Sequence, residues 1–155
     1  MRPATAADAA ALTALINRAF AVERIFLVHE RVTRVQVVSA LGRGSFLLLE
    51  ADGAIEGAVF CEIGGEVASG VGRIGMLSVE PDLQGKGIGR RLVEEAESFF
   101  RNRGCAFSEL RIVDLRRELP PFYRKLGYVG VATEPFPEEI EVTMPCQLLR
   151  MSKTL

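Results

Sequence analysis

The chain has 155 residues, of which 48% are hydrophobic and 25% charged, with a formal net charge of −1. This balance is typical of a soluble globular protein, and the near-neutral charge argues against nucleic acid or an anionic membrane as the main partner. The length predicts a single domain over residues 1–155. Neither a membrane span of about 18 apolar residues nor a signal-peptide pattern is present, so we expect a cytoplasmic protein.

The few cysteines and the single histidine limit the chemistry that the chain can support. Cys61, Cys105 and Cys146 are scattered, without a C-x-x-C pair, which favours reduced thiols in a cytosolic protein. His29 is the only histidine, so a histidine-rich metal site is excluded. Nothing near it supports a Ser–His or Cys–His catalytic pair. We therefore expect no metal cofactor.

The first third of the chain predicts two helices, each opened by a capping box. Residues 1–4 are too short for a proper strand. The first capping box, at residues 5–8, precedes an apolar helix face formed by Leu12, Leu15, Ile16, Ala19 and Phe20. The second, at residues 33–36, opens a short helix that stops at Gly42. Residues 21–31 fit either a helical extension or a loop with buried apolar side chains.

A β-hairpin is predicted next, from two apolar runs around a turn signal. The runs are residues 45–50 and 55–62, joined by Asp-Gly at positions 52–53. The glycine-rich residues 67–73 predict a loop, after which a central strand resumes around Ile74.

The chain is organised around residues 75–103. An apolar strand over residues 76–79 breaks at Pro81 and is followed by a glycine-rich turn into a helix. Apolar residues recur there at helical spacing, at Ile88, Leu92, Val93, Ala96, Phe99 and Phe100. Gly104 supplies the left-handed residue that ends such a helix.

The turn before this helix has the composition of a pyrophosphate cradle. Gly85, Gly87 and Gly89 let a ligand approach the backbone, and the first N–H groups of the helix lack internal partners. Lys86, Arg90 and Arg91 strengthen the positive field at the helix start. The pattern is not a Walker A loop, because glycine rather than Ser or Thr follows the lysine.

The remainder of the chain predicts strand, helix, strand and a final strand. A compact strand covers residues 109–113, and a short helix begins at Pro120 or Pro121 and runs to Leu126, closed by Gly127. Two further strands are expected over residues 128–133 and, interrupted by a proline, over roughly 141–151. This order of elements predicts an α/β or α+β fold with a mixed sheet.

Two segments resemble the GCN5-related N-acetyltransferase (GNAT) superfamily. Residues 84–89, QGKGIG, resemble its acetyl-CoA motif Q/R-x-x-G-x-G/A, and the preceding residues 77–81 resemble the strand that leads into it. Residues 121–128, PFYRKLGY, resemble the family's second recurring segment. The resemblance covers nearly the whole chain. It implies the GNAT fold, a mixed, mostly antiparallel central sheet flanked by helices, here with a shortened first strand.

The resemblance also implies acetyl-CoA as cosubstrate and a set of residues that bind it. The pantetheine arm and thioester would lie along Met76, Leu77, Ser78 and Val79, through main-chain groups at a bulge. The pyrophosphate would be held by Gln84, Gly85, Lys86, Gly87, Ile88, Gly89 and Arg90. Tyr123 would act as the general acid, or as a hydrogen-bond donor, because a phenol pKa of about 10 exceeds a thiol pKa of about 8.5. The family's pantetheine-binding asparagine is absent; Asp114 stands in that region.

The general base is left unassigned. Several acidic residues lie on or near strands that face the expected cleft: Glu62, Glu66, Glu80 and Glu109. His29 and Glu30 fall in the region that forms one wall of the family's acceptor site, either as substrate contacts or as a solvated surface pair.

The function implied is acetyl transfer from acetyl-CoA to a primary amine, on a small molecule or a protein, by direct attack in a ternary complex. A ping-pong route would need an acyl-cysteine, and nothing beside Cys61 suggests activation. The alternative is a non-catalytic acyl-CoA-binding sensor or interaction module.

Relatives pair through C-terminal strands, so Leu148, Leu149 and Met151 belong either to a homodimer interface or to the core.

Overall fold

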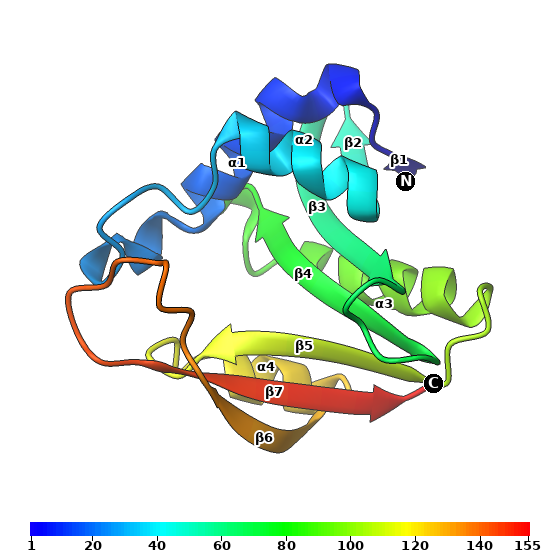
Figure 1. Cartoon of the computed structure of the whole chain (residues 1–155). Coiled ribbons are helices and arrows are strands. Elements are labelled where there is room, and N and C mark those ends of the chain that lie inside the picture. The colour runs from blue at the N-terminus through cyan, green and yellow to red at the C-terminus, as the bar shows by residue number, and fades with distance from the viewer.

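The computed structural model describes residues 1–155 and is built on one seven-stranded sheet. The strands follow the order β1-β2-β3-β4-β5-β7-β6. All neighbours are antiparallel except β4 and β5, which run parallel. The mixed, mostly antiparallel sheet flanked by helices is therefore confirmed (Figure 1).

The N-terminal elements match the predicted capping boxes. The chain begins with β1 (Arg2–Pro3), a strand shortened to two residues, and continues through a 3₁₀ turn, η1 (Ala6–Asp8), into α1 (Ala9–Ala19). The Thr5 N–H donates to Asp8 Oδ2 at 2.7 Å, and the Thr33 N–H donates to Gln36 Oε1 at 2.8 Å. Reciprocal bonds of this kind satisfy the free donors at a helix start.

The helix α2 (Arg34–Arg43) runs past the predicted stop at Gly42. The residue that follows it is Gly44, where a Cβ atom would overlap the carbonyl oxygen of Cys61. The close approach of the helix end to the neighbouring strand therefore requires glycine at position 44, whereas position 42 has open space. The ambiguous residues before α2 form a second 3₁₀ turn, η2 (Ala21–Ile25), and an irregular segment.

The predicted hairpin is confirmed as β2 (Ser45–Ala51) and β3 (Ala54–Ile63). Asp52 and Gly53 both have positive φ, at 52° and 77°, as the tight turns between twisted strands require. The next strand, β4 (Val71–Val79), begins three residues before the predicted Ile74. Residues 67–70 of the glycine-rich run form the predicted loop, but residues 71–73 belong to the strand, where Gly72 makes room for the Phe100 ring.

The helices pack on opposite faces of the sheet, so successive side chains of a strand face different helices. In β2, Phe46 and Leu48 face α1 and α2, whereas Leu47 and Leu49 face α3. Figure 1 shows α1 and α2 in front of the sheet and α3 and α4 behind it. This alternation, with a period of two, produces two apolar layers.

The C-terminal half completes the sheet. A 3₁₀ turn, η3 (Pro81–Leu83), precedes α3 (Ile88–Arg101), and the remaining elements are β5 (Phe107–Val113), α4 (Leu119–Lys125), β6 (Val129–Pro135) and β7 (Gln147–Thr154). None of the helices is both long and apolar enough to cross a membrane.

The last strand, β7, starts later than predicted. Its place inside the sheet explains its apolar residues. It starts at Gln147, after the proline, rather than near residue 141; Val142 forms only an isolated bridge with Leu27. Because β7 lies between β5 and β6, it has no free edge. Met151 is fully buried in the core, and Leu149 packs against the same cluster.

Candidate functional site

A cavity of about 1020 Å³ opens where β4 and β5 diverge. The two parallel strands are paired only over Val71–Ile74 and Phe107–Leu110. Figure 1 shows them spreading apart beyond this point. The edge of β4 beyond Ile74 therefore has no partner strand, and its main-chain groups are available to an extended ligand.

A β-bulge at Met76 shapes this edge. The residue has a φ of +47°, and the register with β3 shifts, so that Ala58 pairs with Ser78 but Phe60 pairs with Gly75. A bulge inserts an extra residue and redirects side chains, and it is common beside active sites. Met76, Leu77 and Val79 line the cavity. Ser78 does not: its side chain is buried, and its hydroxyl donates to the Met76 carbonyl at 3.0 Å.

The glycine-rich loop after β4 also borders the cavity, through all its predicted residues except Lys86. Gly85 and Gly87 have φ values of +79° and +83°, and a Cβ atom at either would meet no atom within 4 Å. Gly87 is the residue before α3, so the loop presents the free N–H groups of a helix start to open space. Gln84 ties the loop to β4, because its Nε2 donates to the Val79 carbonyl at 3.3 Å.

Gly89 has a different role from the first two glycines of the loop. A Cβ atom there would lie 3.4 Å from Phe122 Cζ, in van der Waals contact, so this position faces α4 rather than open space. Arg90 lines the cavity and forms an ion pair with Glu94 at 2.9 Å.

Two neighbouring tyrosines are placed for different roles. Tyr123 lines the cavity, and no hydrogen bond joins its hydroxyl to another protein group. Tyr128 is held in a buried network with Ser108 at 2.7 Å and Glu97 at 3.1 Å. Burial raises the pKa of Tyr123 well above its ordinary value, although the Arg116 charge opposes the shift. Tyr123 is therefore a protonated phenol whose donor is free.

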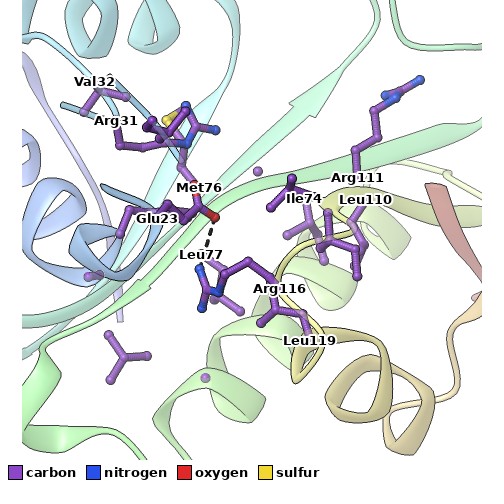
Figure 2. Close-up of a pocket in the computed structure, with 18 of the residues that line it drawn as sticks. Glu23, Arg31, Val32, Ile74, Met76, Leu77, Leu110, Arg111, Arg116 and Leu119 are labelled. Carbon is purple, nitrogen blue, oxygen red and sulfur yellow. Dashed lines mark hydrogen bonds and ion pairs between the residues drawn. The ribbon is translucent and has the colours of Figure 1, made fainter. Parts of the chain in front are cut away.

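Sequence analysis did not identify several charged residues that line the cavity, among them Glu23, Arg31 and Arg116. Glu23 is buried, and its Oε1 accepts a hydrogen bond from Arg116 Nη1 at 3.1 Å, as Figure 2 shows. Burial raises the pKa of Glu23, while the charges of Arg31 and Arg116 oppose the shift. Glu23 and Arg116 are separated by 93 residues, and no local pattern indicates such a pair.

The acids that the sequence suggested as bases are placed elsewhere. None of Glu62, Glu66, Glu80 and Glu109 lines the cavity. Three of them pair with arginines: Glu62 with Arg43 at 3.5 Å, Glu80 with Arg18 at 2.8 Å, and Glu109 with Arg150 at 3.2 Å.

Other residues singled out by sequence divide between the cavity and the scaffold. His29 and Glu30 line the cavity with exposed side chains. Asp114 does not, and its Oδ1 accepts the Gln147 N–H at 3.0 Å, fixing the start of β7. No cysteine reaches the cavity; Cys61 is in the core, where burial raises the pKa of its thiol to about 12. No group of His, Cys, Asp or Glu side chains is arranged to hold a metal ion.

Solved structures of acetyltransferases share this fold. A ribosomal-protein-alanine N-acetyltransferase from Brucella melitensis aligns with a TM-score of 0.79 and 22% identity, covering 99% of this chain and 98% of that one. A putative streptothricin acetyltransferase from Bacillus anthracis, solved in complex with acetyl coenzyme A, aligns with a TM-score of 0.63 and 14% identity, covering 73% and 63% of the two chains. At such identities the likeness concerns the fold.

Sequence comparisons identify the family. An uncharacterized N-acetyltransferase of Chlorobaculum tepidum is 33% identical over 86 residues, which cover 51% of this chain and 52% of the relative. The match thus spans about half the length of the curated relative. The family model described as an acetyltransferase (GNAT) domain matches residues 42–130, which include the β4 bulge, the glycine loop and Tyr123. Because this match covers more than half of the chain, the protein belongs to the GNAT acetyltransferase family.

Proposed function

We propose that the protein is an acetyl-CoA-dependent N-acetyltransferase that acetylates a primary amine by direct attack in a ternary complex. One observation carries this proposal: the unpaired edge of β4, the open glycine loop and the free hydroxyl of Tyr123 border the same cavity. Membership of the GNAT family supports acetyl transfer in general. Direct attack is favoured because no cysteine lines the cavity to serve as an acyl carrier.

The residues around the cavity fit acetyl-CoA, which supplies the acetyl group as a thioester. The main chain from Met76 to Val79 would bind the pantetheine arm as an added strand. The N–H groups at Gly85, Gly87 and the start of α3 would bind the pyrophosphate, since a helix start favours anions. The open space at both glycines leaves room for a ligand against the backbone. Among its fold relatives, the Bacillus anthracis protein binds acetyl-CoA.

Glu23 is the residue best placed to receive the acceptor's proton. An amine with an ordinary pKa of 10.4 costs about 4.6 kcal/mol to deprotonate at pH 7. Glu23 is the one buried carboxylate that lines the cavity, and its Oε2 has no hydrogen-bond partner in the chain. Burial raises its pKa, which strengthens it as a base. We assign the base role to Glu23, acting directly or through water.

Tyr123 completes the reaction as a hydrogen-bond donor to the leaving sulfur. Glu23 takes the ammonium proton and releases it to solvent water. The neutral nitrogen then bonds to the acetyl carbon as the carbon–sulfur bond breaks, its second proton passes to Glu23, and CoA leaves as a thiolate. Because burial raises the pKa of Tyr123, full transfer of its proton to a thiolate is unfavourable. A hydrogen bond to the sulfur, which carries the developing negative charge, is the role that this environment supports.

Initial-rate kinetics test the direct-attack mechanism. With acetyl-CoA and an accepted amine both varied, thiol release should give intersecting double-reciprocal lines. Mass spectrometry after incubation with acetyl-CoA alone should find no acetylated cysteine. Parallel lines together with an acetyl-cysteine would contradict the ternary complex, and a protein that acetylates no amine in a broad panel would contradict the enzyme assignment.

A further inference from the structure

One cavity arginine differs from the others in having no carboxylate partner. Five arginines line the cavity. Four of them form ion pairs, with nitrogen–oxygen distances from 2.6 to 3.5 Å: Arg43 with Glu62, Arg90 with Glu94, Arg111 with Glu134, and Arg116 with Glu23. The fifth, Arg31, has neither an ion pair nor a side-chain hydrogen bond in the chain.

The surroundings of Arg31 make an unpaired charge costly. Its side chain is half-buried, and its guanidinium carbon lies 5.2 Å from the centre of the Phe20 ring. Burial lowers the pKa of Arg31, while the charge of Glu23 opposes this shift. A charge removed from water needs a partner of opposite sign, and the chain supplies none within ion-pair distance. Figure 2 shows the side chains of Arg31 and Glu23 drawn together in the cavity.

We propose that Arg31 binds an anionic group on the acceptor, a carboxylate or a phosphate, so that the acceptor is an amine carrying an acid close to its nitrogen. This inference rests on the proposed function. The planar guanidinium can hold either anion through two parallel N–H bonds, while its carbon lies over the Phe20 ring. Glu23, which influences the pKa of Arg31 from within the same cavity, receives the amine of the same molecule.

Arg31 lies in a different segment of the chain from the residues proposed to bind acetyl-CoA. Of its neighbours, Phe20 is the residue between α1 and η2, and Glu23 belongs to η2. The proposed pyrophosphate cradle is a different segment, residues 84–90. Because Arg31 has no ion-pair partner in the chain, its positive charge is available to the second substrate.

Paired amines test the inference, because each pair differs only in the anion. One arm compares α-amino acids with their carboxamides, and the other compares 2-aminoethyl phosphate with ethanolamine, which distinguishes a carboxylate from a phosphate. The wild-type kcat/KM should be at least about tenfold higher for the anionic member of one arm, as expected for a charge-assisted contact. Arg31→Gln should remove that preference by lowering only the anionic rate, and Arg31→Lys should restore part of it.

Arg24→Gln is the matched control. Arg24 lies in η2, is exposed, pairs with Glu30 at 3.3 Å and does not line the cavity, so its loss changes the net charge equally and should leave the preference intact. A titration with acetyl-CoA precedes the rates. If acetyl-CoA binds but neutral amines react as fast as anionic ones, or no anionic amine reacts, this inference is overturned. Failure to bind acetyl-CoA would remove the proposed function as well.

Discussion

Tyr123 and Tyr128 are five residues apart, yet their hydroxyl groups have opposite surroundings. The Tyr128 hydroxyl is fixed by Ser108 and Glu97, whereas that of Tyr123 has no protein partner and borders the cavity. Their rings pack edge to face, with centroids 5.8 Å apart. Tyr128 is therefore held by the structure, whereas the Tyr123 hydroxyl is free for the role proposed above.

We predict that Tyr123→Phe lowers kcat about 100-fold, because a donor to the leaving sulfur is lost. The acetyl-CoA Kd and the melting temperature should stay near the wild-type values, since no protein hydrogen bond is removed. Tyr128→Phe is the control: it should lower the melting temperature by breaking the buried network while leaving kcat within a few-fold. An unchanged kcat in Tyr123→Phe would remove Tyr123 from the mechanism.

At the scale of single residues, the sequence identifies candidate site residues that share a local spacing. The alternating glycines of residues 85–89 and the Phe-Tyr segment have recognisable spacing, and the structure places both at the cavity. Glu23 and Arg31 have no such spacing. Their significance comes from burial and from tertiary neighbours, which a reading of the chain in order does not reveal.

Among the elements, α3 and β4 pack directly on one another through Phe100 and Gly72. Phe100 of α3 is fully buried, and its ring occupies the space beside Gly72 of β4. A Cβ atom at Gly72 would overlap the first carbons of this ring. Because the overlap is with the rigid base of a side chain, a small rotation does not relieve it.

Gly72→Ala should therefore destabilise the protein by about 2 kcal/mol, through overpacking. Urea unfolding measures this change, and Phe100→Leu in the same chain should recover part of it. Gly42→Ala is the matched control, because this helical position has open space and alanine favours a helix by about 1 kcal/mol. Equal stability of Gly72→Ala and the wild type would contradict the packing described here.

The existence of the elements follows from apolar periodicity and caps, whereas their ends depend on contacts. The predicted start of β4, Ile74, lies three residues after the observed start. The reason is that Gly72 resembles a loop residue until its contact with Phe100 is known. The predicted end of α2 at Gly42 is early because the constraint lies at Gly44, against β3. In both cases, the deciding neighbour is distant in sequence.

Across the whole molecule, one buried carboxylate connects three parts of the fold. Glu97 of α3 accepts from Lys153 of β7, with Nζ at 2.9 and 3.0 Å from its two oxygens. It also accepts from Tyr128, whose hydroxyl contacts Ser108 of β5. This network fixes the helix behind the sheet to the strands beyond the β4–β5 opening.

Lys153→Met should cost about 3 kcal/mol of unfolding free energy, because a nearly buried carboxylate loses its main cation. Arg101→Met is the control at the same carboxylate. Arg101 is half-exposed and lies 3.4 Å away, so its removal should cost less than about 1 kcal/mol. Equal effects in chemical denaturation would show that Glu97 is not the centre of the network.

The overall architecture is predicted well by the order of elements and by the resemblance to a known family. The mixed sheet, the shortened first strand and the helix after the glycine loop are all present. The insertion of β7 between β5 and β6 is harder to predict from the sequence. It depends on pairing between strands that are far apart in the chain, and local patterns do not set that order.

Calorimetric titration with acetyl-CoA tests the central claim, that the cradle at the start of α3 binds this cosubstrate. The wild type should bind acetyl-CoA with micromolar affinity and should not bind ATP. Gly87→Glu should abolish binding, because it places bulk and negative charge at the pyrophosphate. Gly64→Glu carries the same strain, with a φ of +78° in open space away from the cavity, and should bind normally. A folded wild type that fails to bind acetyl-CoA, or a Gly87→Glu protein that retains micromolar binding, would contradict the claim.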